Sequence, residues 1–168
     1  VVDRLARALG DWRPASPVER RGVPPVDPRS EPAEVRVLLP GKAQVDLIWG
    51  VLGMPRTSPD YYGAQVANVI LGRLGLMGRL GANVRDRLGL AYYVSSVLQV
   101  GPGPHPWNVV AGVNPRDVDR AVEAILDEIR RIRETLVSKE ELADSKTYLY
   151  VALPLLLETN DGISSLLL

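Results

Sequence analysis

The chain has 168 residues, of which 46% are apolar and 24% are charged, and its formal net charge is zero. This length suits a single domain with its own core, and the neutral charge gives no electrostatic reason to expect nucleic acid or an anionic membrane as a partner. Because the sequence has no cysteine, disulfides, thiol catalysis and cysteine-based metal sites are excluded.

Both ends of the chain are expected to be points at which a longer protein has been truncated. Residues 1–12 are predicted to be the end of a helix, because their apolar residues fall on one face. Six prolines lie within residues 13–33, and since proline removes backbone donors, this stretch is predicted to be an extended linker. A helix end followed by a linker indicates a preceding domain. Residues 34–168 are the domain proper, which we expect to be truncated at its C-terminal end.

The first half of the domain is predicted to hold two strands and two helices. Apolar residues alternate with a strand's period in two runs, separated by a turn at Pro40-Gly41: Val35, Val37 and Leu39, then Val45, Leu47, Trp49 and Val51. A helix is predicted to start at Ser58-Pro59, with helical spacing at Tyr62, Val66, Val69 and Ile70. A second, short helix has Leu80, Val84 and Leu88 on one face and ends at Gly89.

The second half repeats this pattern. Residues 90–99 are predicted to be a strand, and a further strand is indicated by the alternation of Trp107, Val109, Ala111 and Val113. Asn114-Pro115 caps the clearest helix, whose apolar stripe is Val118, Ala121, Val122, Ile125, Ile129, Ile132 and Leu136. Ser138 and Glu141 have capping-box spacing and open a last helix, which is expected to bend or stop near Pro154.

The predicted order of elements is therefore β-β-α-α-β-β-α-α. Since the strands come in adjacent pairs, the sheet should be largely antiparallel. The helices should cover one of its faces, which makes an α+β two-layer domain.

Few residues in this sequence suggest chemistry. The only histidine, His105, lies between two prolines; one histidine cannot make a usual zinc site, no serine lies in a nucleophile motif, and a loop histidine is the simpler interpretation. Gly72, Gly75, Gly78 and Gly81 match no phosphate-binding motif, so close backbone packing or a mobile loop accounts for them better than a nucleotide site. The acidic pairs Asp127-Glu128 and Glu140-Glu141 are expected on solvated helix faces rather than as catalytic pairs.

One pair of residues is a sharper candidate. Arg85 lies in the last turn of the short helix, Gly89 turns the chain, and Tyr92 opens the next strand. A guanidinium and a phenol can both donate hydrogen bonds to a carbonyl or a developing oxyanion. The structural alternative is that Arg85 complements the helix C-terminus while Tyr92 is a half-buried strand residue. By simple alternation, Tyr93 is expected on the opposite face of the strand.

The stretch from Ile70 to Ser96 resembles the signature of the second domain of pitrilysin-family zinc peptidases, which include insulin-degrading enzyme and mitochondrial processing peptidase. The matching positions are Ile70-Leu71-Gly72, Arg79-Leu80, Arg85 and Gly89-Leu90-Ala91-Tyr92. The sequence departs from the pattern at Arg73, where a second glycine is usual, and at Gly78, where serine is usual. The resemblance continues over essentially all of residues 34–168, and the stretch from Leu5 to Pro14 resembles the end of the preceding family domain and its linker.

The resemblance implies an enzyme of two domains that close over the substrate like a clamshell. Its zinc site, a His-x-x-Glu-His helix with a distant glutamate, lies in the first domain, and this chain corresponds to the second. The resemblance assigns Arg85 and Tyr92 to substrate binding, and no metal ligand or catalytic residue to this chain. The chain is then a substrate-enclosing, non-catalytic domain of a zinc metalloendopeptidase, inactive alone, with zinc in a partner domain or subunit and a peptide as substrate. The alternative is an inactive partner or scaffold subunit that binds peptides or supports assembly.

Overall fold

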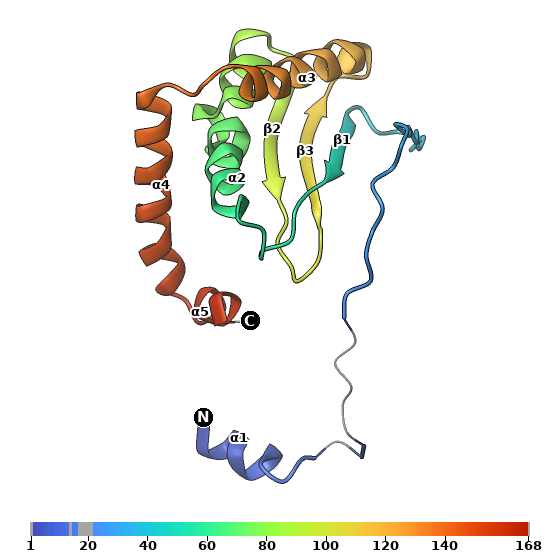
Figure 1. The fold of residues 1–168 in the computed structure, drawn as a ribbon. Helices are drawn as coiled ribbons and strands as arrows, with labels where there is room; N and C mark the ends of the chain where they lie inside the picture. The colour runs from blue at the N-terminus through green and yellow to red at the C-terminus, as the bar shows by residue number, and fades with distance from the viewer. Residues whose placement is uncertain (1, 14, 17–21, 168) are drawn as a thin grey trace.

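The computed structural model describes residues 2–13, 15–16 and 22–167 (Figure 1). The α-helices and strands, in chain order, are α1 (Val2–Leu9), β1 (Val45–Leu52), α2 (Tyr61–Asn68), β2 (Ala91–Leu98), β3 (Pro106–Val113), α3 (Val118–Glu134), α4 (Lys139–Leu157) and α5 (Asn160–Leu167). Between α2 and β2 the chain forms the π-helix η1 (Val69–Arg73), the 3₁₀-helix η2 (Gly75–Met77) and the π-helix η3 (Gly81–Arg87), and a 3₁₀ turn, η4 (Pro115–Asp117), leads into α3.

The three strands form one antiparallel sheet in the order β1-β3-β2. Helical segments pack on one face of this sheet, where the apolar residues of the strands meet them (Figure 1). The opposite face carries partly exposed side chains such as Ile48 and Val97. The predicted α+β two-layer fold with an antiparallel sheet is confirmed.

The core lies between the central strand and two helical segments. Val109, Ala111 and Val113 of β3 are buried against Leu80 and Val84 from around η3 and against Ala121, Ala124 and Ile125 of α3. The predicted stripe of α3 is confirmed as far as Ile132, which packs against the core. Leu136 is 95% exposed, because α3 ends at Glu134 and the chain leaves the helix before the stripe can continue.

The first predicted strand is wrong. Residues 32–39 have no regular structure, and Val35 is 84% exposed. The turn that follows is present, since Lys42 N donates to Leu39 O and Gly41 adopts a φ of 81°. An alternating sequence is not enough to make a strand, because the backbone must also pair with a neighbour. Among the described residues, β1 pairs with β3 and with no other strand. The observed order therefore lacks the first of the eight predicted elements.

Two helix boundaries also differ from the prediction. The helix α2 begins at Tyr61 rather than at Ser58-Pro59, and it buries Tyr61 while Tyr62 is exposed. Because Ser58 Oγ accepts a hydrogen bond from Asp60 N, the Ser-Pro pair forms a turn ahead of the helix. Of the expected bend or stop near Pro154, the stop is wrong, because the helix α4 continues to Leu157 with Pro154 inside it. The next helix, α5, begins at Asn160, where Thr159 Oγ1 accepts a hydrogen bond from Gly162 N.

The glycine-rich segment packs closely against its neighbours, as the sequence indicated. A Cβ atom on Gly72 would lie 2.6 Å from Ser96 N of β2, and one on Gly81 would lie 2.2 Å from Gly75 O. Both distances are shorter than real Cβ contacts. A larger residue at position 72 would therefore push η1 away from the sheet, and a larger residue at position 81 would force open the turn at Gly75. Gly75 also adopts a φ of 62°, which favours glycine.

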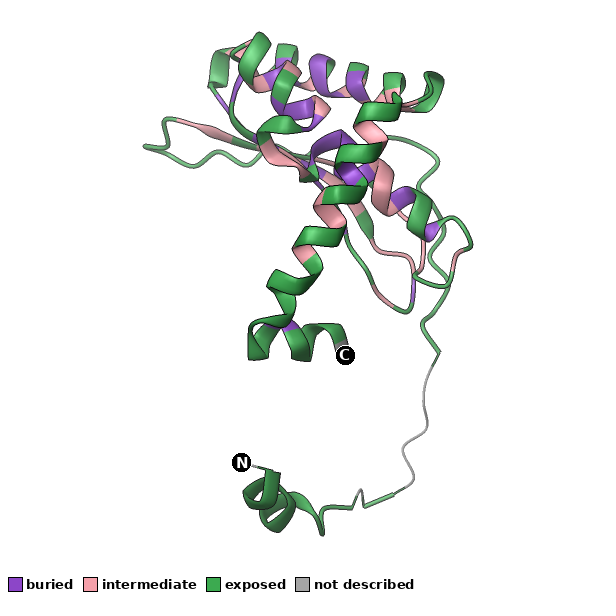
Figure 2. Cartoon of the chain, turned by 90° about the vertical axis from the view of Figure 1, so that its left-hand side faces the viewer, coloured by how far each residue is buried: buried purple, intermediate pink, exposed green. Residues whose placement is uncertain are grey.

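The C-terminal half of α4 and the whole of α5 extend beyond the sheet and its helices (Figures 1 and 2). Their exposed apolar residues are Tyr150, Val151, Leu153, Leu155, Leu156, Leu157, Ile163 and Leu166. In the part of the chain that the structure describes, no helix is both long and apolar enough to cross a membrane.

Replacing Ile125 by aspartate is expected to unfold the domain. Ile125 is 1% exposed and lies in the core, so the substitution removes about 2–5 kcal/mol of packing and also buries a charge. Such a loss is comparable with the whole stability of a domain, which is about 5–15 kcal/mol. Circular dichroism and limited proteolysis of the intact protein would measure it. Leu136→Asp is the matched control and should leave melting unchanged, whereas a folded Ile125→Asp variant with normal melting would contradict the packing.

Candidate functional site

Tyr92 lies at an irregularity in the sheet. Ala91 pairs with Val113 and Tyr93 pairs with Gly112, so Tyr92 is an extra residue in β2, as in a β-bulge. Ala91 and Val94 are buried, while Tyr92 is 78% exposed and Tyr93 is 41% exposed. The expectation that Tyr93 points to the opposite face from Tyr92 is therefore wrong, because the bulge cancels the alternation between these two residues.

Arg85 lies in the last turn of η3, on the other side of a tight turn. Gly89 adopts a φ of 63°, and its N–H donates to Arg85 O at 3.0 Å, which closes the helix and sends the chain into β2. The guanidinium of Arg85 is partly exposed and lies 3.6 Å from the carboxylate of Asp86. The turn brings Arg85 and Tyr92 to the same end of the sheet, but no hydrogen bond joins their side chains in the described residues.

A shallow cleft of about 400 Å³ lies beside Tyr92. Its lining comes from the starts of two strands and the end of the third. The lining residues are Ala43 and Gln44 just before β1, Gly89 to Tyr92 at the start of β2, and Gly112 to Asn114 at the end of β3. None of these residues carries a charge. The side-chain nitrogen of Gln44, Nε2, is buried in this region and has no hydrogen-bond partner among the residues that the structure describes.

Tyr93 is fixed next to this cleft by a small polar network. Its hydroxyl donates to Asp46 Oδ1 at 2.9 Å, and Asp46 also forms an ion pair with Lys42. The hydrogen bond from Lys42, with that from Tyr93, lowers the pKa of Asp46, and donation to Asp46 raises the pKa of Tyr93. The ring lies over Gly112, where a Cβ atom would come within 2.4 Å of it.

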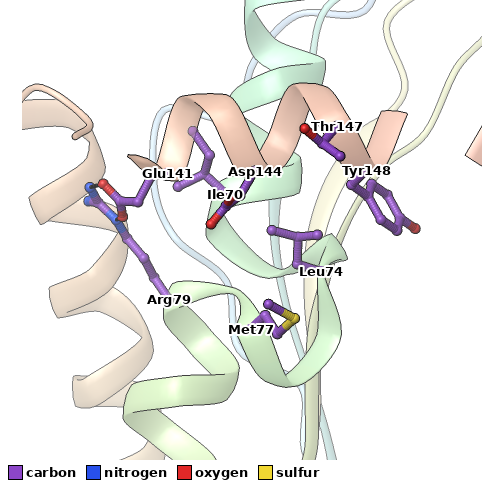
Figure 3. A pocket seen from close by; sticks show the side chains of 8 residues that line it. All are labelled: Ile70, Leu74, Met77, Arg79, Glu141, Asp144, Thr147 and Tyr148. Atoms are coloured by element: carbon purple, nitrogen blue, oxygen red, sulfur yellow. Dashed lines mark hydrogen bonds and ion pairs between the residues drawn. The ribbon is translucent and has the colours of Figure 1, made fainter. Parts of the chain in front are cut away.

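A second cavity, of about 320 Å³, lies between the glycine-rich segment and α4 (Figure 3). Leu74 and Met77 line it from one side and Asp144, Thr147 and Tyr148 from the other. At one end Arg79 and Glu141 form a two-point contact, with Nε to Oε1 at 2.6 Å and Nη2 to Oε2 at 3.0 Å. Glu141 also closes the predicted capping box with Ser138, so one carboxylate both caps α4 and holds it against the domain. The capping box is confirmed.

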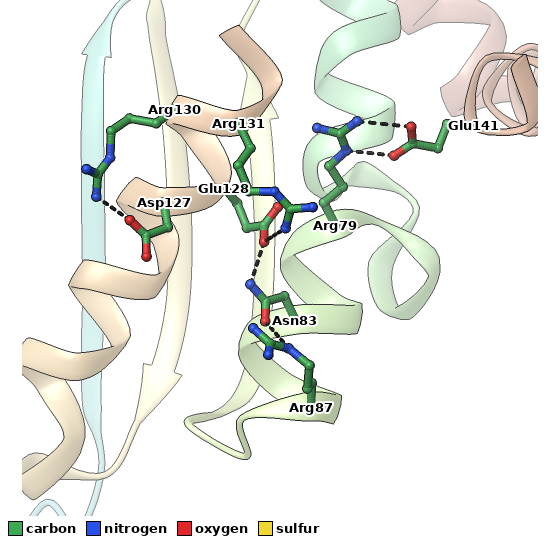
Figure 4. A network of polar contacts seen from close by, with 8 residues as sticks. All are labelled: Arg79, Asn83, Arg87, Asp127, Glu128, Arg130, Arg131 and Glu141. Carbon is green, nitrogen blue, oxygen red and sulfur yellow. Dashed lines mark hydrogen bonds and ion pairs between the residues drawn. The ribbon is translucent and has the colours of Figure 1, made fainter. Parts of the chain in front are cut away.

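A buried carboxylate joins α3 to η3 (Figure 4). Glu128 is 1% exposed, and its Oε1 accepts from Asn83 Nδ2 and, at 2.8 Å, from Arg131 Nη1. The expectation that Glu128 lies on a solvated face is wrong, whereas Asp127 is exposed. Glu128 lies three residues after Ile125 on the apolar stripe of α3, and that spacing was the signal for its burial.

The structure gives His105 no partner for a metal site. Its ring packs beside Gly101, where a Cβ atom would lie 1.9 Å from Nε2. Within residues 2–13, 15–16 and 22–167, no three histidine or carboxylate side chains are grouped so that they could hold a metal ion.

The ion pair between Arg79 and Glu141 predicts a pH-dependent contribution to stability. The hydrogen bonds from Arg79 lower the pKa of Glu141 to about 2, from an ordinary value of 4.5. A carboxylate whose pKa is lowered by folding stabilises the fold above its unfolded pKa, and that stability is lost as the pH falls through the folded pKa. Glu141→Gln keeps the capping box and removes the charge, so it should lower the free energy of unfolding by about 1–2 kcal/mol at neutral pH.

Urea unfolding of the intact protein at a series of pH values would measure this difference. The gap between wild type and Glu141→Gln should be full above about pH 5 and should close as the pH approaches 2. Glu140→Gln, at an exposed neighbouring residue, is the control and should match wild type. A gap that does not change with pH would contradict the ion-pair explanation.

Comparison with known proteins gives one family and a set of similar folds. A family model described as "Peptidase M16 inactive domain" matches residues 1–149. The solved structure of a peptidase M16 inactive domain from Pseudomonas fluorescens is similar at 27% identity and a TM-score of 0.62, over 65% of this chain and 26% of that one. No curated protein matches the chain.

Two further structures share the fold over almost the whole chain. One is the periplasmic protease PqqL from Escherichia coli, with 19% identity, a TM-score of 0.69 and coverage of 98% of this chain and 18% of that one. The other is a chain of complex III2 from Candida albicans, with 20% identity, a TM-score of 0.73 and coverage of 97% and 40%. The chain therefore spans less than half the length of each of these three proteins.

Proposed function

The chain belongs to the pitrilysin-like peptidase M16 family as its inactive domain, and from this premise we propose that it encloses the substrate of a zinc metalloendopeptidase. A non-catalytic domain needs a second domain or subunit to supply the zinc. In the described part of this chain, no three histidine or carboxylate side chains are grouped so that they could bind a metal ion.

The observation that carries the proposal is the placement of Tyr92. The bulge in β2 leaves its phenol exposed at one end of the sheet, beside a cleft and on the far side of the Gly89 turn from Arg85. A phenol and a guanidinium both donate hydrogen bonds, and neither requires a metal to do so. We assign both side chains to binding the peptide near the bond that is cleaved.

Peptide hydrolysis in such an enzyme uses a zinc-activated water, with the zinc held by the partner domain or subunit. The residues of this chain would bind and orient the peptide. Tyr92 and Arg85 would donate to its carbonyl oxygens and to the negative charge that develops during attack, where preorganised donors have their largest effect.

The alternative function is an inactive partner or scaffold subunit. The exposed apolar residues of α4 and α5 favour an assembly role, and a chain of complex III2 from Candida albicans has the same fold. The discriminating observation is a His-x-x-Glu-His motif, encoded upstream of Val1 or in a neighbouring gene. An upstream motif indicates an active peptidase, a motif only in the neighbour indicates an inactive partner subunit, and neither favours the scaffold.

The purified chain is expected to bind no stoichiometric zinc. It has one histidine and no cysteine, and carboxylates alone make poor zinc sites. Metal analysis after dialysis against zinc would measure the bound amount. A tight one-to-one site would overturn the assignment of zinc to another domain or subunit.

In the complete peptidase, Tyr92→Phe and Arg85→Ala are each expected to lower turnover by about 10²- to 10³-fold, the usual effect of losing one preorganised donor. Zinc content should not change, because the metal is held elsewhere. The fold should survive, since Tyr92→Phe removes only a hydroxyl that is already exposed. Turnover of a quenched fluorescent peptide, zinc content and melting temperature would be measured together.

Tyr93→Phe cannot serve as the control, because Tyr93 bonds Asp46 next to the same cleft. Tyr62→Phe and Arg73→Ala are better controls, since both residues are exposed and lie on other elements. Near-normal turnover in both site variants would show that neither side chain acts on the substrate.

A further inference from the structure

We propose that Gln44 is a further substrate-binding residue, whose carboxamide donates a hydrogen bond to a backbone carbonyl of the peptide beside Tyr92. This inference rests on the proposed function, because it places the peptide in the cleft at this end of the sheet. It adds a residue that lies outside the segment from Arg85 to Tyr92 and that precedes β1 by one position.

The geometry of the cleft brings Gln44 to Tyr92 although they are far apart in sequence. Because β1 and β2 both pair with β3 in antiparallel fashion, the start of each strand lies at the end of β3: Val45 and Ala91 both pair with Val113. Gln44 and Tyr92 flank these two positions, and both line the same cleft. The cleft volume of about 400 Å³ is in the range of binding sites for small ligands or short peptide segments.

The amide of Gln44 is held at this position without a hydrogen-bond partner. Its Nε2 lies over Gly112, where a Cβ atom would come within 2.1 Å of it, so any other residue at 112 would displace the amide. The nitrogen is buried and unpaired, and a buried unpaired donor is unfavourable. In the proposed complex the side chain leaves this buried position and presents its N–H to a carbonyl oxygen in the cleft that Gln44 lines.

The chemistry of the lining identifies a peptide backbone as the ligand. The residues that line the cleft carry no charge, so it lacks the cationic side chains that make the strongest contacts with phosphate or carboxylate groups. It offers the phenol of Tyr92 and the carboxamides of Gln44 and Asn114 among glycines and apolar side chains, and the oxygen of Asn114, Oδ1, already accepts from Arg116 N. Neutral hydrogen-bond donors among apolar contacts suit an extended peptide, whose carbonyl groups need donors and whose side chains vary.

The test uses the complete, zinc-loaded peptidase and a pool of short, unstructured, internally quenched peptides. Gln44→Glu keeps the size of the side chain, removes the N–H donor and adds a negative charge, which the control variant adds as well. We expect the hydrogen bond from Gln44 to be equally strong in the bound state and in the transition state. Its loss should therefore raise KM about five- to tenfold and leave kcat unchanged. Gln99→Glu, at an exposed position near the other end of the sheet, is the matched control and should change neither value.

Binding is measured separately with a fluorescein-labelled peptide and enzyme from which zinc has been removed. Gln44→Glu should weaken this binding by the same factor as it raises KM. Unchanged KM and unchanged binding would overturn the role of Gln44, even if Tyr92→Phe lowers turnover as expected. A lower melting temperature with unchanged KM would also overturn it and would show that the amide stacks on the ring of Tyr93 as a structural contact.

The two proposals fail in different ways. If Tyr92→Phe and Arg85→Ala keep normal turnover while Gln44→Glu raises KM, the cleft binds peptide but the assignment of the pair is wrong. If all three variants behave as wild type, the peptide does not occupy this end of the sheet, and both proposals are overturned.

Discussion

The architecture depends on how closely the helical layer approaches β2. Gly72 lies so near Ser96 that no side chain fits between them, and the buried Asn68 joins the same layer to two strands. Its backbone oxygen accepts from Ser96 Oγ at 3.1 Å, and its side-chain oxygen accepts from Trp107 Nε1 at 2.9 Å. Because these contacts are short and polar, they fix the position of η1 along the strands as well as its distance from them. The remaining helical segments are then placed relative to η1.

Two charged contacts extend this arrangement from the core to the helices that surround it. Arg79, just before η3, holds the start of α4 through Glu141, and Asn83, within η3, holds α3 through Glu128 (Figure 4). The segment that carries Arg85 is thus connected to the helices on both sides of it. A partly buried charged contact of this kind has a fixed geometry, since leaving either partner alone would bury an unpaired charge. This rigidity suits a segment that presents a side chain to a substrate.

The sequence predicted the features that depend on local patterns and missed those that depend on distant neighbours. The stripe of α3, the capping box at Ser138 and the Gly89 turn each follow from residues close together in the chain, and each is confirmed. The residues from Val35 to Leu39 alternate like a strand but have no pairing partner in the described part of the chain, and a sequence pattern does not supply one. The position of Glu128 on the apolar stripe of α3 is a local signal for its burial, but its partner Asn83 lies 45 residues away in the chain, and no local pattern predicts that contact.

For the candidate site, the sequence predicted the residues but not the reason they are accessible. Strict alternation would give Tyr92 and Tyr93 opposite faces, so only one of the two rings could reach the solvent beside the cleft. The bulge adds one residue to β2, so the register with β3 shifts by one between Ala91 and Tyr93, and both rings are exposed. Tyr93 then bonds to Asp46 and covers Gly112, while the hydroxyl of Tyr92 has no hydrogen bond to the residues that the structure describes. Because Tyr92 is exposed, a ligand can replace the water around its hydroxyl without breaking a contact within the protein, and a bulge is a common way for a sheet to re-aim such a side chain.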